Sequence, residues 1–141
     1  MNSPEVEKLI PQRAPIRMVD RLLEVDDDRA VTCLTVRTDN YFATPEGTMA
    51  EPGLIEHIAQ SASALAGYLA LKEGEKEAPV GYVGEIKNFH CYRCPHIGEK
   101  LRTTITLDGE IEGITLVTGE VRSQGELLAA TRMKISISRN P

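Results

Sequence analysis

The sequence predicts an α+β domain in which a curved antiparallel sheet wraps one long central helix. The segment from 51 to 70, EPGLIEHIAQSASALAGYLA, opens on Pro52 and Gly53 and then has no glycine or proline before Gly67. Apolar or small side chains cover nearly every face of this predicted helix, so it must be buried on most sides. Six short apolar runs flank it, and a sheet built from them can surround it.

Four elements are predicted before the long helix. Residues 3–10 begin with a serine that can cap a helix and are followed by a proline that ends it, so they predict a short helix. The apolar runs 18–25 and 30–36 are separated by Asp26-Asp27-Asp28, which predicts a hairpin with a charged turn. Residues 39–50 combine proline and glycine with polar side chains and predict a loop that leads into the helix.

Four strands are predicted after the helix. A charged linker at 72–77 ends the helix, and glycines then mark the turns between apolar runs. Apolar and polar residues alternate cleanly between Leu101 and Leu107, which is the pattern of a half-buried strand. The predicted strands cover 80–89, 100–107, 114–121 and 127–137, with breaks at Gly98, Asp108-Gly109, Gly113 and Gln124-Gly125.

Length and composition indicate a single domain over residues 1–141, long enough to bury a core. The formal net charge of −5 argues against nucleic acid or an anionic membrane surface as the main partner. No apolar run approaches the ~18 residues of a membrane span. The first ten residues, MNSPEVEKLI, lack the pattern of a signal peptide. Three cysteines, an odd number, suit a reducing compartment. We therefore expect a cytoplasmic protein.

The predicted sheet also has consequences for assembly. A small open sheet leaves edge strands with unpaired backbone groups, and proteins commonly protect such edges by pairing subunits across a two-fold axis. We therefore expect a homodimer or a higher homo-oligomer, with the active clefts at the subunit boundary.

The first turns of the apolar helix contain three polar side chains, Glu56, His57 and Gln60. A carboxylate in such surroundings must be paired, exposed at a cleft or functional, because burying it alone is costly. Glu56 is therefore the leading catalytic candidate, although it could merely cap its own helix. Gln60 follows one turn later on the same face and can orient Glu56 or bond a neighbouring backbone group.

His57 is the second catalytic candidate because it is adjacent to Glu56. Neighbouring helix positions point about 100° apart, so the two side chains do not simply share one pocket wall. His57 could still serve as a base across a dimer interface. The alternative is a core or interface histidine whose ring nitrogens are satisfied by hydrogen bonds, and this alternative is the more common one.

The segment from His90 to His96 contains Cys91 and Cys94 and invites a metal interpretation. Structural zinc sites usually use a second, distant ligand pair, and the only other cysteine is Cys33. A strand that continued through the segment would also point residues three apart to opposite faces. We therefore expect no metal and no other cofactor. Thioredoxin-type redox chemistry is not favoured either, since that motif begins a helix in a βαβ unit.

Three motifs span most of the chain and carry a resemblance to a known family. Residues 10–21, IPQRAPIRMVDR, are similar to L-P-H-R-x-P-x-x-x-x-D-R, with Gln12 in place of histidine. Residues 52–60 are similar to P-G…E-x-x-A-Q on a central helix. Residues 84–101 are similar to a strand ending in phenylalanine followed by P-G-D-x-L, with Ile97 in place of proline. In this order the motifs resemble the hotdog-fold β-hydroxyacyl-thioester dehydratases of fatty-acid synthesis, and especially their relatives in aryl-polyene pigment clusters.

The resemblance implies a hotdog fold and a 3-hydroxyacyl substrate on an acyl carrier protein or coenzyme A. Dehydration needs a base for the C2 proton and an acid for the departing hydroxyl. The family motif assigns Glu56 to this chemistry and Gln60 and Gly53 to substrate binding, with backbone N–H groups around Gly53 holding the thioester oxygen. The chain departs from the family at 42–49, where a G-H-F-P segment usually supplies the catalytic histidine and no histidine is present.

Three functions therefore remain open. The first is dehydration of a 3-hydroxyacyl thioester. The second is acyl-thioester hydrolysis with the helix carboxylate, since hotdog thioesterases resemble this arrangement and need no histidine. The third is a non-catalytic role, in which the chain binds acyl groups or completes a heterodimer with an active hotdog dehydratase.

Overall fold

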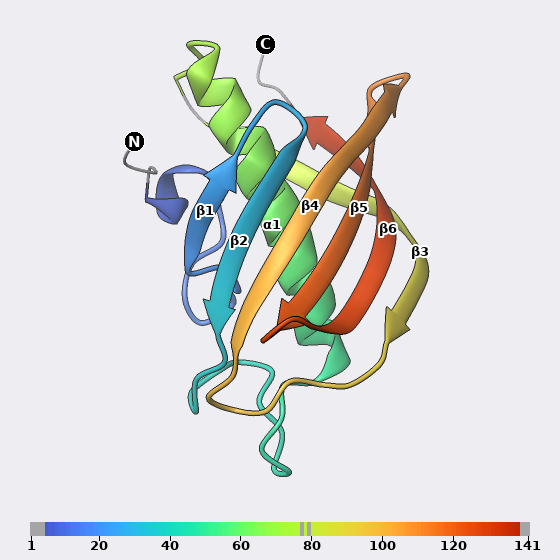
Figure 1. Cartoon of the computed structure of the whole chain (residues 1–141). Helices are drawn as coiled ribbons and strands as arrows, with labels where there is room; N and C mark the ends of the chain where they lie inside the picture. Colours follow the sequence, from blue (N-terminus) through green and yellow to red (C-terminus); the bar gives the residue numbers. More distant parts are fainter. Residues whose placement is uncertain (1–4, 77, 79, 139–141) are drawn as a thin grey trace.

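The structure, a computed structural model, describes residues 5–138 apart from 77 and 79. A six-stranded antiparallel sheet curves around one long helix, α1 (Glu51–Lys72), as Figure 1 shows. A short 3-10 helix, η1 (Val6–Lys8), precedes the sheet. The strands are β1 (Arg21–Val25), β2 (Arg29–Thr35), β3 (Val80–Cys91), β4 (Lys100–Ile111), β5 (Ile114–Ser123) and β6 (Glu126–Ser138).

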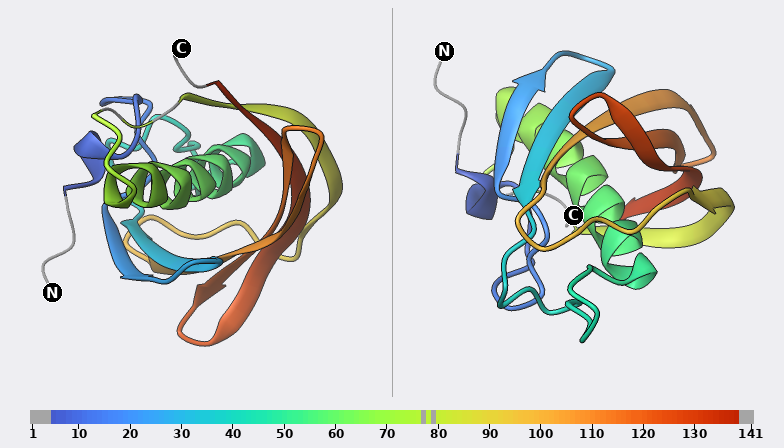
Figure 2. Two further views of the ribbon diagram at one scale, coloured as in Figure 1. Left: turned by 90° about the horizontal axis from the view of Figure 1, so that it is seen from above. Right: turned by 60° about the horizontal axis from the view of Figure 1, so that its bottom comes forward.

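The sheet has the order β1-β2-β4-β5-β6-β3, so β1 and β3 form its two edges. Figure 2 shows the sheet curling around α1, which lies in its concave side. Neighbouring strands pair antiparallel throughout. The predicted α+β architecture, with a central helix inside a curved antiparallel sheet, is therefore confirmed.

Helix α1 covers the predicted segment 51–70, with Pro52 in its first turn, and extends two residues further, to Lys72. Its small residues allow unusually close packing. A Cβ on Gly67 would lie 2.3 Å from the Leu9 carbonyl oxygen, so a side chain there would push against backbone. In the part of the chain that the structure describes, no helix combines the length and apolarity needed to cross a membrane.

Two predicted boundaries differ from the structure. The expected break at Asp108-Gly109 is wrong, because the pairing of β4 with β5 only shifts register there, as in a β-bulge, and continues to Ile111. The turn follows at 112–113, where both residues have positive φ. The first helix is limited to the short η1, and residues 3 and 4 of the predicted helix lie outside the described residues.

The core is aliphatic, and its cover is incomplete at the β3 edge. Val83 pairs with Ile135 and Ile86 pairs with Met133, so these four side chains lie on the same face of the sheet. Ile135 and Met133 are buried, at 4% and 2% exposed, whereas Val83 and Ile86 are each 39% exposed. The concave side of β3 therefore presents apolar side chains that this chain alone does not cover.

Candidate functional site

Glu56 and Gln60 meet on α1 as their spacing predicts. The Gln60 side-chain amide donates from Nε2 to Glu56 Oε1 at 2.7 Å. Gln60 is 1% exposed, whereas Glu56 is only partly buried. Within the described part of the chain, Glu56 Oε2 has no protein partner. The carboxylate is thus held by one oxygen and free at the other.

The orientation of Gln60 is fixed by the segment that precedes β1. Its Oε1 accepts the Met18 backbone N–H at 2.6 Å, and its Nε2 also donates to the Ile16 carbonyl at 3.0 Å. Because the amide oxygen is occupied by Met18, the amide nitrogen must face Glu56. Glu56 therefore meets a hydrogen-bond donor at Oε1.

His57 is fully buried, and both of its ring nitrogens are engaged. Nδ1 lies 2.6 Å from the Met18 carbonyl oxygen and must donate to it, since a carbonyl only accepts. Nε2 lies 2.6 Å from Thr103 Oγ1 and accepts the hydroxyl proton. Burial lowers the pKa of His57 from 6.5 to about 4, so the ring is neutral at pH 7. The side chains of His57 and Glu56 form hydrogen bonds with different groups and not with each other.

Gly53 is buried at the start of α1, where the preceding loop packs against it. A Cβ at this position would lie 2.8 Å from both Phe42 Cβ and Met49 Cγ, so only glycine allows the loop this close. The Gly53 N–H donates to the Ala50 carbonyl at 2.9 Å. One of the N–H groups around Gly53 that are predicted to hold the thioester oxygen is thus engaged within the first turn of the helix.

The loop before α1 rests on the segment that follows β3. Met49 donates its N–H to the Pro95 carbonyl at 2.9 Å. That segment is anchored by Arg93, whose guanidinium binds Glu99 at 2.6 Å and Glu126 at 3.0 Å. Arg93 is the main reason that the pKa of Glu99 falls to about 2. These ion pairs therefore fix the segment after β3, which bonds the loop that leads into the first turn of α1.

The two neighbouring cysteines lie closer than the sequence suggests. Strand β3 ends at Cys91, the chain then turns, and the Sγ atoms of Cys91 and Cys94 lie 3.9 Å apart as free thiols. The expectation that they point to opposite faces is wrong because the strand does not continue. Burial, with Cys94 and Glu51 nearby, raises the pKa of Cys91 to about 12. Among the described residues, no group of three or more His, Cys, Asp or Glu side chains is placed to hold a metal ion.

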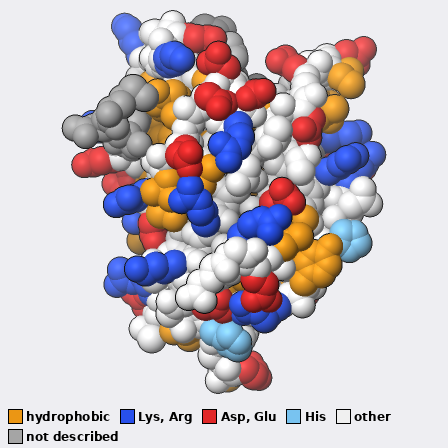
Figure 3. Space-filling view, in the orientation of Figure 1, with side chains coloured by type: hydrophobic (Ala, Val, Ile, Leu, Met, Phe, Trp, Pro, Cys, Tyr) orange, Lys and Arg blue, Asp and Glu red, His pale blue; other side chains and the backbone are white. Residues whose placement is uncertain are grey.

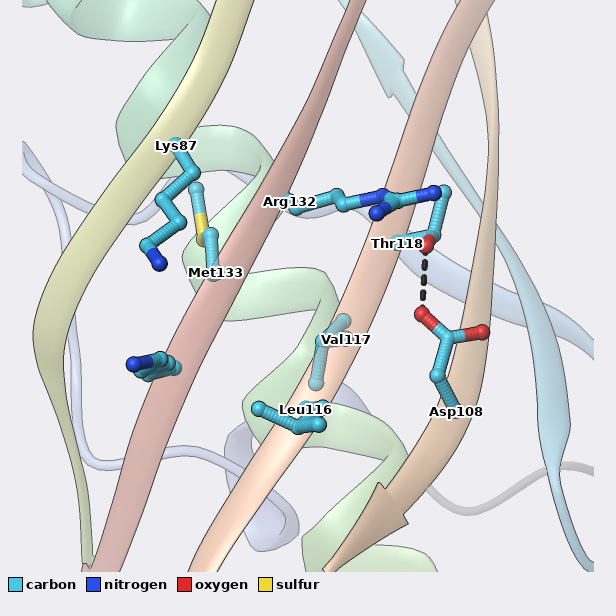
Figure 4. Close-up of a pocket in the computed structure, with 8 residues that line it drawn as sticks. Lys87, Asp108, Leu116, Val117, Thr118, Arg132 and Met133 are labelled. Atoms are coloured by element: carbon cyan, nitrogen blue, oxygen red, sulfur yellow. Dashed lines mark hydrogen bonds between the residues drawn. The ribbon is translucent and has the colours of Figure 1, made fainter.

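A separate hollow of about 340 Å³ lies across β3 to β6, lined partly by Lys87, Arg132 and Thr118. Figure 4 shows that Lys87 and Arg132 extend in different directions, while Asp108 accepts a hydrogen bond from Thr118. Figure 3 shows positive and negative side chains interspersed over the face of the molecule that it draws. Glu56 does not line the hollow. The charges there do not converge on one point, so we place the candidate site at Glu56.

Comparisons with known proteins match nearly the whole chain. Residues 4–140 match the family model ApeP-like, described as ApeP dehydratase. The chain is 27% identical over 144 residues to the 3-hydroxyacyl-(acyl-carrier-protein) dehydratase FabZ of Pseudothermotoga lettingae, covering 99% of both chains. It is 29% identical to FabZ of Cupriavidus metallidurans, covering 91% of both.

Solved structures show the same fold. The dehydratase heterocomplex ApeI:P from Xenorhabdus doucetiae matches with a TM-score of 0.91 at 20% identity, covering 99% of this chain and 94% of that chain. A hypothetical thioesterase from Streptococcus pneumoniae matches with a TM-score of 0.68 at 10% identity, covering 85% and 91%. The hotdog fold that the sequence motifs imply is therefore confirmed.

Proposed function

Because this chain belongs to the ApeP-like dehydratase family, we propose that it dehydrates a 3-hydroxyacyl group carried as a thioester on an acyl carrier protein or coenzyme A. The proposal rests on one observation above all. Glu56 stands at the start of the buried helix with one carboxylate oxygen held by Gln60 and the other free to meet a substrate.

The free oxygen of Glu56 suits a proton transfer. In the elimination, a proton leaves C2 of the acyl group, the C3–O bond breaks, and the departing hydroxyl leaves as water after protonation. Glu56 Oε2 takes the C2 proton or delivers the proton to the hydroxyl. His57 does not supply the second proton-transfer group from within this chain, because both ring nitrogens are committed to Met18 and Thr103.

The start of α1 is suited to stabilise the thioester oxygen as negative charge develops on it. The N-terminal end of a helix carries a partial positive charge. Since the Gly53 N–H already donates to Ala50, we assign this stabilisation to the helix end as a whole. Gly53 contributes by allowing the loop with Phe42 and Met49 to pack closely against that end.

A second candidate function is that of a subunit which completes a heterodimer with a histidine-bearing hotdog chain. The observation that favours it is that 42–49, where the family motif usually has the catalytic histidine, contains none, and that both ring nitrogens of the helix residue His57 are engaged in the core. Thioester hydrolysis is the third candidate. It needs only one carboxylate and the positive end of a helix, which this chain has.

One panel of assays separates these functions. The chain is incubated with 3-hydroxyacyl and simple acyl thioesters of coenzyme A and of an acyl carrier protein. We expect enoyl absorbance to appear from the 3-hydroxyacyl substrates. Release of free thiol without enoyl product would replace dehydration by hydrolysis. No reaction of the isolated chain, with activity on adding a histidine-bearing hotdog chain that it captures, would assign the partner role.

The β3 edge is the proposed subunit contact. Its inward-facing Val83 and Ile86 are partly exposed, and pairing with a second chain would cover them. We expect light scattering to show a dimer at micromolar concentration, and Ile86→Glu to shift it to monomer because an interface would bury the charge. Ile111→Glu is the control, since Ile111 is even more exposed, at 62%, but lies at the β4–β5 turn. A stable wild-type monomer would contradict this assembly.

A further inference from the structure

We propose that His57 is a positioning residue for the reaction at Glu56 and acts on it through the Met18 backbone and Gln60. This role rests on the proposed function, in which Glu56 transfers the proton. His57 itself does not reach a substrate, since it is completely buried.

The contacts form one continuous chain. His57 Nδ1 holds the Met18 carbonyl at 2.6 Å, and Gln60 Oε1 holds the N–H of the same residue at 2.6 Å. Met18 is thus gripped on both sides of its backbone by two side chains of α1. The nitrogen of the same Gln60 amide, Nε2, donates to Glu56 Oε1 at 2.7 Å. The position of Met18 therefore sets which way the Gln60 amide faces.

The direction of that amide decides what Glu56 meets. A glutamine side chain ends in an acceptor oxygen and a donor nitrogen of nearly equal size, so it can bind in two opposite orientations. With the Met18 N–H in place, the oxygen is used there and the nitrogen donates to Glu56. If the segment with Met18 moved away, the amide would lose both the Met18 N–H and the Ile16 carbonyl that hold it. It could then turn over and place its oxygen against the carboxylate, which would repel it. His57 prevents this by holding Met18.

The Met18 carbonyl fixes the tautomer of the histidine, because a carbonyl only accepts and the ring proton must therefore lie on Nδ1. Nε2 is left as an acceptor, and the Thr103 hydroxyl on β4 donates to it and holds that side of the ring in place. The opposite tautomer would put two acceptors face to face at Met18. A path of hydrogen bonds therefore links Thr103 in the sheet, through His57, Met18 and Gln60, to the carboxylate of Glu56.

A second buried network on α1 provides a matched control. Ser61 donates to the His57 carbonyl at 2.7 Å and lies 2.7 Å from the Thr32 hydroxyl. Ser61 is fully buried, like His57, but its side chain makes no hydrogen bond to Met18 or Gln60. Ser61→Ala therefore removes buried hydrogen bonds to Thr32 and to the His57 backbone, while the side-chain bonds from His57 through Met18 and Gln60 to Glu56 remain.

The experiment compares turnover by His57→Leu, His57→Asn and Ser61→Ala, in the preparation that dehydrates a 3-hydroxyacyl thioester. We expect His57→Leu to lower kcat about 10-fold or more with little change in KM, since small misplacements of a reacting group are costly. Asparagine places an N–H donor near the position of Nδ1, so His57→Asn should restore most of kcat. Ser61→Ala should leave kcat close to the wild-type value. Equal losses in His57→Leu and Ser61→Ala, or an unchanged kcat in folded His57→Leu, would overturn the role.

A readout independent of activity separates this inference from the proposed function. The side-chain ¹⁵N–¹H signals of Gln60 should shift in His57→Leu and stay in place in Ser61→Ala. Unmoved Gln60 signals would overturn the positioning role, whatever the activity. The proposed function has its own test, because full activity of Glu56→Gln would refute that function and not the positioning role. If His57→Leu does not fold, Thr103→Val keeps the ring and should shift the same signals and lower kcat, and the absence of both effects would overturn the role.

Discussion

Glu56→Gln is expected to lower turnover of a 3-hydroxyacyl thioester by ~10²-fold or more, the range for loss of a general acid or base, while the protein stays folded. The substitution keeps nearly the same size. It also keeps an oxygen that can accept the hydrogen bond from Gln60, which is 2.7 Å long in the wild type. The amide that replaces the free oxygen cannot exchange a proton, so the loss should appear in the chemical step.

The matched control is Glu51→Gln, which removes a carboxylate from the first turn of the same helix. Glu51 is exposed, and the Gln60 amide bonds Glu56 and not Glu51. If negative charge near the helix end were the only requirement, both variants would lose activity alike. Initial rates on 3-hydroxyacyl and simple acyl thioesters are compared, with Tm as the control for folding. Full activity in folded Glu56→Gln would show that this carboxylate has no part in the mechanism.

Acidification should remove a stabilising contribution of His57 to folding. The pKa of this residue is about 4 in the folded protein and 6.5 in the reference state, chiefly because the charged ring would be buried. Below pH 6.5 the unfolded chain binds a proton that the folded protein does not accept, so unfolding becomes more favourable. The contribution is complete above pH 6.5 and is lost as the pH falls toward 4. The loss amounts to about 3 kcal/mol.

The measurement is urea unfolding of the wild type and His57→Asn between pH 7.5 and pH 4.5. Asparagine does not titrate, so the difference in unfolding free energy between the two proteins should shrink as the pH falls. Other titrating groups are common to both and cancel. Glu99 also affects acid stability, but its pKa of about 2 places most of that loss below pH 4.5. A difference that stays constant with pH would contradict the assignment of a neutral, buried His57.

The motifs around the helix were sufficient to identify the family and to pair two of the candidate residues. Glu56 and Gln60 are four residues apart, and helix geometry alone places such residues on one face. The same geometry indicated that His57 would point elsewhere. The sequence gives no comparable rule for the partners of His57, because Met18 and Thr103 lie 39 and 46 residues away in the chain.

Short-range periodicity is sufficient to predict the apolar helix, the alternating strands and the hairpin between β1 and β2. Features that need partners far away in the chain depend on how these elements pack. Pairing with β5 turned Asp108-Gly109 into a bulge within β4, and a change of chain direction after β3 brought Cys91 near Cys94. The fixed orientation of Gln60 belongs to this second group, because Met18 reaches it from outside the helix and no local pattern encodes that contact.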